Sequence, residues 1–185
     1  IQNGTYVPVF VTSGTHEIGL AKLLDAIIKL MPSPADRPPE VAQGASGEEE
    51  LPASDSGPLA VYTWKTTADP YVGKITYFRV YSGVLNADSR VWNQSIGAEE
   101  RFGGISVTRG NEQLPVKVVH AGDIASVPKL SETSTSHTLC DRNHPLILQV
   151  PEYPSPLYRV AVFPESQADS AKISPTLTRI CEEDM

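Results

Sequence analysis

The sequence lacks the features that would place it in a membrane or around a metal ion. No apolar run approaches the roughly 20 residues that a membrane helix needs. The two cysteines, Cys140 and Cys181, belong to no Cys-x-x-Cys pair, which excludes a zinc knuckle and a dithiol redox motif. No histidine stands at ligand spacing from a second ligand, and we treat all four as surface or loop residues: His16, His120, His137 and His144.

An initiator Met and the basic, then apolar, start of a signal peptide are also missing. The chain begins at Ile1 and ends at Met185, directly after three acidic residues. We therefore expect an internal fragment of a longer cytoplasmic protein that contacts no membrane.

A strongly basic composition, typical of domains that bind nucleic acid along a whole face, is missing too. The formal net charge is −7. Residues 36–57 hold six acids and one base, however, whereas residues 58–150 hold eight acids and nine bases. Because the acidity is concentrated in one short stretch, a local basic patch that contacts RNA remains possible in the larger segment, and we expect no DNA partner.

Residues 1–37 have the pattern of the last strand and helix of an α/β domain. Residues 6–11 form a short apolar run rich in β-branched and aromatic side chains, which predicts a buried strand. Residues 20–31 repeat apolar side chains at intervals of three and four, which predicts an amphipathic helix that ends before Pro32 and Pro34.

Residues 38–57 contain few apolar side chains and many Gly, Ser and Glu residues. Such a segment buries too little surface to offset its ordering entropy, so we expect an acidic flexible linker or surface loop. The alternative is an acidic interaction tail.

Residues 58–150 alternate apolar and polar side chains in several short runs that are separated by turn residues. This pattern predicts a mainly β fold, either a closed antiparallel β-barrel or a sandwich. The predicted barrel core comprises the apolar members of the runs: Val61, Phe78, Val80, Val91, Ile105, Val127 and Ile147.

Residues 151–185 change pattern once more and predict the first strand and helix of an α+β domain. Residues 156–164 alternate as a strand, with Tyr158, Val160 and Val162 on one side. Because a proline inside a helix costs about 3 kcal/mol, we expect the helix to start with Ser174 as N-cap and Pro175 as first residue.

Several motifs in this order resemble the elongation factor G family of translational GTPases. Residues 69–83 read DPYVGKITYFRVYSG, similar to the opening of domain II in that family. Shorter matches follow the family's order at residues 24–34, 121–124, 138–141 and 160–184. The resemblance covers nearly the whole chain except the acidic segment. It implies a domain II barrel between the end of a GTP-binding (G) domain and the start of domain III, in elongation factor G or an elongation factor G-like paralogue.

The resemblance also implies that the parent protein binds GTP and Mg²⁺ and hydrolyses GTP on the ribosome. A Gly-x-x-x-x-Gly-Lys-Ser/Thr loop and an Asn-Lys-x-Asp motif are absent, so we expect the chain itself to be inactive and without cofactor. Ser13 and Gly14 stand at the family's guanine-facing loop, which reads Ser-Ala and whose backbone amide binds the guanine oxygen. Ser13 matches this pattern, and Gly14 replaces the usual alanine. Ser136 and His137 stand where the family has Gly-Asp. This difference argues against a turn that needs glycine and against an acidic contact at these two positions.

In the family, domain II contacts its own G domain and small-subunit ribosomal RNA. The corresponding candidates in the motif are Asp69 and Gly73, together with Lys74 at the start of a predicted strand. Arg79 lies in mid-strand beside Phe78, so that alternation turns it outward together with Tyr77 and Tyr81. Arg101 is a further candidate, but it follows Glu99 and Glu100, which favours a local salt bridge.

Three other functions remain open. A separate catalytic unit is disfavoured, because no nucleophile–base order, carboxylate pair or metal cluster stands out. A generic β-barrel binding module would leave the ordered motifs unexplained. A ribosome-protection or recycling factor of the same superfamily shares these domains.

Overall fold

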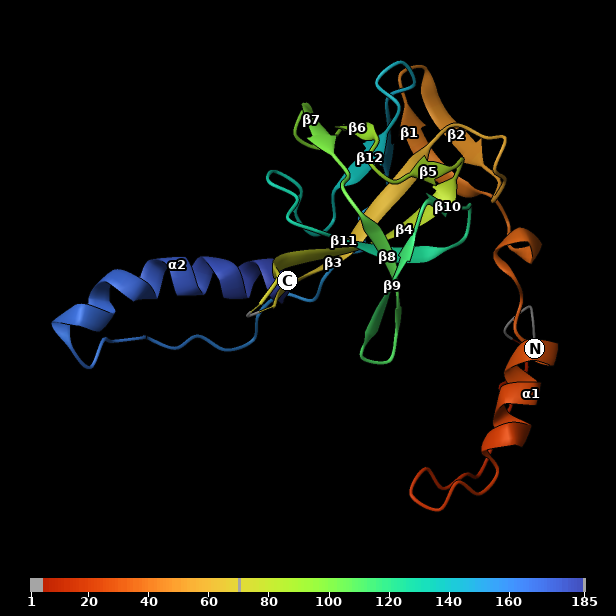
Figure 1. Cartoon of the computed structure of the whole chain (residues 1–185), viewed down its shortest axis with the longest axis horizontal. Helices are drawn as coiled ribbons and strands as arrows, with labels where there is room; N and C mark the ends of the chain where they lie inside the picture. Colours follow the sequence, from red (N-terminus) through yellow and green to blue (C-terminus); the bar gives the residue numbers. More distant parts are fainter. Residues whose placement is uncertain (1–4, 70, 185) are drawn as a thin grey trace. The chain divides into compact units, whose positions relative to one another are not determined.

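The computed structural model describes residues 5–69 and 71–184. Residues 1–4, Pro70 and Met185, which entered the expectations about the chain ends and one turn, lie outside the described residues. The chain divides into two compact units, Ile1–Pro38 and Pro39–Met185 (Figure 1).

The first unit contains helix α1 (Leu20–Leu30) and the short 3₁₀ helix η1 (Pro34–Asp36). Helix α1 ends within one residue of the prediction, before Pro32. Ser33 then caps η1, since its amide and hydroxyl both donate to the Asp36 carboxylate at 2.9 and 2.7 Å. The buried strand predicted over residues 6–11 is wrong: these residues form no strand and are mostly exposed, because no described segment pairs with them.

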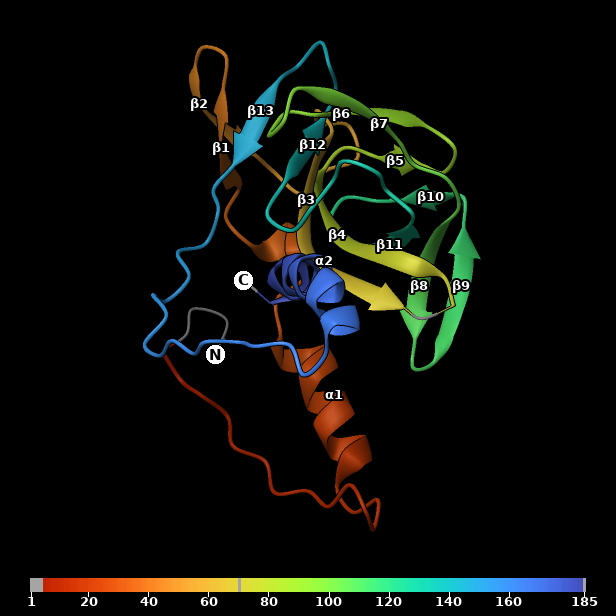
Figure 2. The same ribbon diagram turned by 90° about the vertical axis from the view of Figure 1, so that its left-hand side faces the viewer.

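The second unit is built on an antiparallel sheet of eight strands that curls around one core (Figure 2). The order across the sheet is β7 (Ala98–Arg101), β6 (Arg90–Asn93), β12 (Thr138–Cys140), β3 (Ala60–Asp69), β4 (Gly73–Ser82), β11 (Ile124–Pro128), β8 (Ile105–Arg109) and β9 (Glu112–Val116). A two-stranded ladder joins β5 (Leu85–Asn86) to β10 (Val118–Val119). Within the described residues no ladder joins β7 to β9, so the barrel is open rather than closed by hydrogen bonds.

The core lies inside the curl of this sheet. Phe78 and Phe102 meet edge to face at its centre, with ring centroids 5.4 Å apart. Six of the seven predicted core residues are buried, and Ile147 is the exception at 41% exposed. Its neighbours Leu146 and Leu148 are buried instead, because a one-residue error in strand register exchanges the two faces.

The acidic segment is not a flexible linker over most of its length. Strands β1 (Glu40–Gly44) and β2 (Gly47–Leu51) form a hairpin, and β1 also pairs with β13 (Leu146–Leu148). Ala42 and Leu51 are 1% exposed, in a second apolar cluster with Tyr62 and Cys140. Ala42, Leu51 and the pairing with β13 thus order this segment, although its composition, with few apolar residues, predicted disorder.

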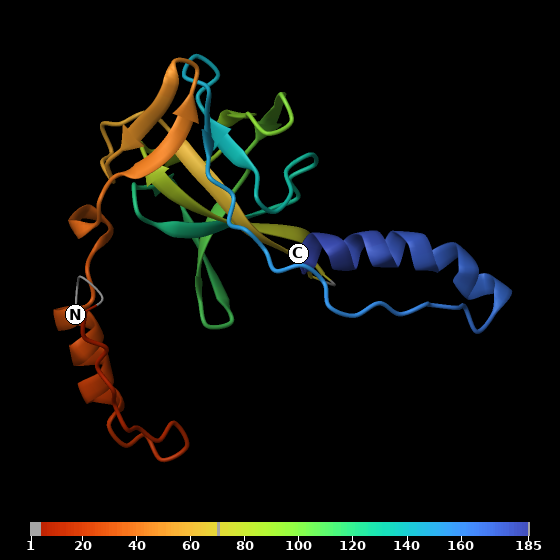
Figure 3. The same ribbon diagram turned by 180° about the vertical axis from the view of Figure 1, so that it is seen from behind.

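Helix α2 (Gln167–Glu183) starts about two turns before Pro175, its predicted first residue. Ser166 is its N-cap, accepting from the Asp169 amide at 3.3 Å, so Pro175 lies inside the helix. The strand predicted over residues 156–164 is wrong, since that segment runs as irregular, exposed chain (Figure 3). No strand among the described residues pairs with the backbone of this segment. No helix in the described ranges is long and apolar enough to cross a membrane.

Candidate functional site

The turn between β3 and β4 is shaped by two of the predicted interface residues. The Asp69 carboxylate accepts hydrogen bonds from the amides of Val72 and Tyr71, each at 2.8 Å. These two bonds hold the pKa of Asp69 below its ordinary value. Gly73 has a φ of +89°, a left-handed conformation that favours glycine. The geometry therefore assigns Asp69 and Gly73 to the turn itself.

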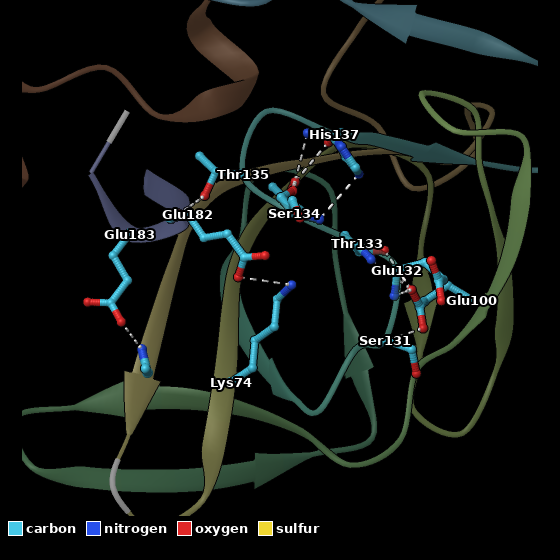
Figure 4. Close-up of polar contacts among 12 residues, drawn as sticks. Lys74, Glu100, Ser131, Glu132, Thr133, Ser134, Thr135, His137, Glu182 and Glu183 are labelled. Carbon is cyan, nitrogen blue, oxygen red and sulfur yellow. Dashed lines mark hydrogen bonds and ion pairs between the residues drawn. The ribbon is translucent and has the colours of Figure 1, made fainter. Parts of the chain in front are cut away.

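Lys74, predicted at the interface with the ribosome or the G domain, pairs with helix α2 within this chain. Its Nζ lies 3.6 Å from the Glu182 carboxylate, and its side chain is 23% exposed (Figure 4). The next helix residue, Glu183, accepts a hydrogen bond from the Ala68 amide at 3.0 Å. Thr135 Oγ1 donates to the Glu182 carbonyl at 3.1 Å. A cleft of about 350 Å³ opens beside these contacts, between the β3–β4 end and the last turns of α2.

The β11–β12 loop (residues 129–137) carries Thr135 and is fixed at its start by Glu100. This carboxylate is buried and accepts hydrogen bonds from the amides of Ser131, Glu132 and Thr133, each at 3.0 Å (Figure 4). This role of Glu100 was not predicted from the sequence. The signal was the alternation of β7, which turns Glu100 inward between the exposed Glu99 and Arg101.

His137 fixes the other end of the β11–β12 loop. Its Nδ1 accepts from the Ser134 amide at 3.2 Å and lies 3.1 Å from the Asn93 side-chain amide. Burial, and then the nearby positive charge of Lys74, lower the pKa of His137 from its ordinary value of 6.5. The ring therefore acts as a neutral acceptor here, and this is the position where the family pattern has Asp.

Ser136 keeps the turn that a glycine was expected to make. Its φ is +67°, a left-handed conformation that is uncommon for residues other than glycine. The departure from the family pattern thus leaves the turn in place, with some backbone strain at Ser136.

Arg79 lies on the outer face of β4 beside an aromatic strip, as predicted. Its guanidinium stacks over the Tyr81 ring at 4.9 Å from the centroid, and Trp64 and Tyr77 pack 5.7 Å apart. The buried Nε of Arg79 has no hydrogen-bond partner in the part of the chain that the structure describes. A cation with an unsatisfied donor on an aromatic face is suited to a partner that brings an oxygen acceptor.

Arg101 does not form the local salt bridge that its neighbours favoured. Glu99 pairs with Arg90 across the β6–β7 ladder at 2.7 Å, and Glu100 is engaged by the β11–β12 loop. Arg101 is exposed and has no ion pair within residues 5–69 and 71–184. The structure does not bring Arg79, Lys74 and Arg101 together as one cluster of free cations.

The loop with Ser13 and Gly14 belongs to the first unit and is only partly available to a ligand. The Ser13 amide donates to the Ile18 carbonyl at 3.0 Å, and its hydroxyl accepts from the His16 amide. Nothing lies within 4 Å of a Cβ built on Gly14. Of the two predicted residues, Gly14 is therefore the one with open space beside its backbone.

Two comparisons with known proteins agree with this fold. Residues 58–142 match the family described as elongation factor G domain 2. The second match is a crystal structure of a protein from Thermus thermophilus, at 25% identity and a TM-score of 0.66. That match covers 96% of this chain and 24% of the Thermus protein, so the chain spans about a quarter of that protein's length. The barrel is thus a translation-factor domain.

Proposed function

Residues 58–142 belong to the elongation factor G domain 2 family, and from this premise we propose that the barrel is the ribosome-docking domain of a translational GTPase. In this proposal the barrel contacts small-subunit ribosomal RNA and its own G domain during translocation or recycling in the cytoplasm. The observation that carries it is the family match on an intact curled sheet. A ribosome-protection factor is the alternative within the same superfamily.

The exposed cations suggest which surfaces make these contacts. Contact with RNA consists mainly of phosphate neutralisation, which needs basic side chains that are free of internal partners. Arg101 meets that condition. Arg79, with its unsatisfied Nε and its aromatic neighbours, suits a more enclosed contact with protein or RNA. Lys74 is the weaker candidate, because Glu182 already neutralises it.

The parent protein, in the same proposal, hydrolyses GTP with the help of Mg²⁺. Bound GTP supplies the phosphoryl group whose transfer to water drives movement on the ribosome. This chain contains no phosphate-binding Gly-x-x-x-x-Gly-Lys motif, so the phosphates and Mg²⁺ need residues other than these. In this proposal, the backbone of Gly14 is the group of this chain that contacts the guanine base.

Binding of small ribosomal subunits, measured by co-sedimentation at several salt concentrations, tests the proposal. We expect the Arg101→Ala and Arg79→Ala variants to bind more weakly, and each lost phosphate contact to reduce the slope of log K against log salt by about 0.7–0.9. Arg109→Ala is the matched control, because Arg109 is exposed on β8 but pairs with Glu112 at 2.7 Å. If the wild-type chain does not bind the subunits, or if both variants bind like wild type, docking through this barrel is refuted.

A further inference from the structure

Three hydrogen-bond donors converge where β3 and β4 approach the β11–β12 loop. They are the Ala68 amide, the Lys74 ammonium and the Thr135 hydroxyl, and we call this group the donor socket (Figure 4). Each donor faces an oxygen of the last turn of α2. The Glu183 carboxylate lies 3.0 Å from the Ala68 amide, and the Glu182 carboxylate lies 3.6 Å from Lys74 Nζ.

The charge around the donor socket favours an anion. The Lys74 ammonium is the positive charge that lines the cleft beside the socket from the barrel. The nearby Asp69 carboxylate is already turned toward the amides of Val72 and Tyr71. Negative charge that reaches the socket is therefore attracted by Lys74 and opposed by one carboxylate that is already hydrogen-bonded.

The acidic residues with which α2 fills the donor socket destabilise the end of the helix on which they stand. Glu182, Glu183 and Asp184 stand at its C-terminal end, where the helix dipole repels negative charge. No side chain of α2 is buried, and Leu177 and Ile180 are 42% and 50% exposed. Helix α2 is thus attached to the barrel mainly by these polar contacts, which a competing anion can replace.

We propose that Ala68, Lys74 and Thr135 form an anion-binding site that the acidic end of α2 occupies as an internal ligand. When α2 leaves, the site accepts a phosphate group from another molecule, so α2 docking and phosphate binding exclude each other. This site stands on its own geometry, and only its use for ribosomal RNA rests on the function proposed above.

The test compares the wild-type chain with the double variant Glu182→Gln/Glu183→Gln. Inorganic phosphate is the first probe, and the NMR shift of the Ala68 amide is the readout. We expect phosphate to bind about tenfold more tightly to the double variant, which corresponds to about 1.4 kcal/mol. The further change Lys74→Gln should abolish this gain. Circular dichroism checks that α2 stays helical, as expected when negative charge is removed from a helix C-terminus.

The matched control is Glu152→Gln/Glu165→Gln, which removes the same charge from the exposed segment before α2 and leaves the helix cap intact. It should bind phosphate like wild type. An Ala68 amide in the Glu182→Gln/Glu183→Gln variant that does not respond to phosphate, or a response equal to that of the control, would overturn the proposal. A single-stranded oligouridylate is the second probe. If phosphate binds and the oligouridylate does not, the anion site stands while its use for RNA fails.

Discussion

The carboxylate of Glu100 accepts hydrogen bonds from both the backbone amide and the hydroxyl of Thr133, at 3.0 and 2.9 Å. Thr133 Oγ1 in turn accepts from the Asn93 side-chain amide at 3.0 Å, and that amide lies 3.1 Å from His137. Polar contacts therefore connect β7 to both ends of the β11–β12 loop. The same loop carries Thr135, so the position of the donor socket depends on Glu100.

The Glu100→Gln variant tests this dependence. A neutral amide replaces one acceptor oxygen by a donor that faces backbone amides, so we expect the free energy of unfolding to fall by about 1–3 kcal/mol. Chemical denaturation measures the change. Glu99→Gln is the control, because Glu99 forms an exposed pair with Arg90 that is worth about 0–1 kcal/mol. Equal losses in the two variants would contradict the role assigned to Glu100.

Phe78→Ala should remove the centre of the barrel core. Phe78 is 0% exposed and packs against Phe102, so we expect a loss of about 3–5 kcal/mol in the free energy of unfolding. Ile147→Ala, at a half-exposed position of β13, should cost much less. Thermal unfolding of the two variants measures the difference, and a Phe78→Ala variant that melts like wild type would refute the core assignment.

Protonation of His137 should destabilise the fold in acid. Because its pKa is lowered in the folded state, the unfolded chain takes up the proton first as the pH falls below about 6.5. The contribution to stability is therefore unaffected at neutral pH and is lost progressively as the pH falls from 6.5 toward the folded pKa. NMR titration of the ring measures the folded value directly. A midpoint at or above 6.5 would contradict the buried acceptor role.

Limited proteolysis with a glutamate-specific protease should distinguish the exposed, irregular segment before α2 from the β1–β2 hairpin. The sequence pattern predicted the reverse, a strand in the first segment and a flexible linker in the second. We expect early cleavage after Glu152 and Glu165, which lie in exposed chain without strand partners. Cleavage after the glutamates of β2 should be slow, because β2 is paired along its length with β1. Leu51→Ala removes a buried anchor of the hairpin and should accelerate cleavage there; early cleavage at β2 in the wild type would count against the hairpin.

The chain alone should bind neither GTP nor GDP. It has no phosphate-binding loop, and the Ser13 amide already donates to Ile18. Calorimetric titration with each nucleotide should show no heat of binding, whereas micromolar affinity would mean that another part of the chain forms a nucleotide site.

Local periodicity predicted those elements whose partners follow closely in sequence. Helix α1 and the long strands β3 and β4 were predictable because alternation, repeats and turn residues are local signals. The β1–β2 hairpin was not, since its burial depends on β13, about 100 residues further along the chain. The start of α2 was missed because the helix was placed so that Pro175 would be its first residue, whereas the helix begins after the Ser166 cap and contains Pro175.

The candidate site was harder to predict than the fold. The sequence motif placed Asp69, Gly73 and Lys74 together and predicted that they form a surface open to a partner. Only the structure shows that Glu182 pairs with Lys74 there and that Glu183 accepts from the Ala68 amide, although both glutamates stand more than 100 residues later. Arg101 shows the opposite difference, since it was expected to be neutralised by a neighbouring glutamate. Strand alternation directs Glu100 inward, which leaves Arg101 without the partner that sequence proximity had suggested.

Strand β2 is the outermost strand of the sheet in the order β13, β1, β2, and it reads Gly-Glu-Glu-Glu-Leu. A free strand edge offers unpaired amides and carbonyls to any other extended chain, including a second copy of the same protein. Glu49 on this strand lies 2.8 Å from His144, but Glu48 and Glu50 are exposed, and their charges would repel a second copy that brings the same charges. The acidity of this segment thus disfavours edge-to-edge pairing of two chains.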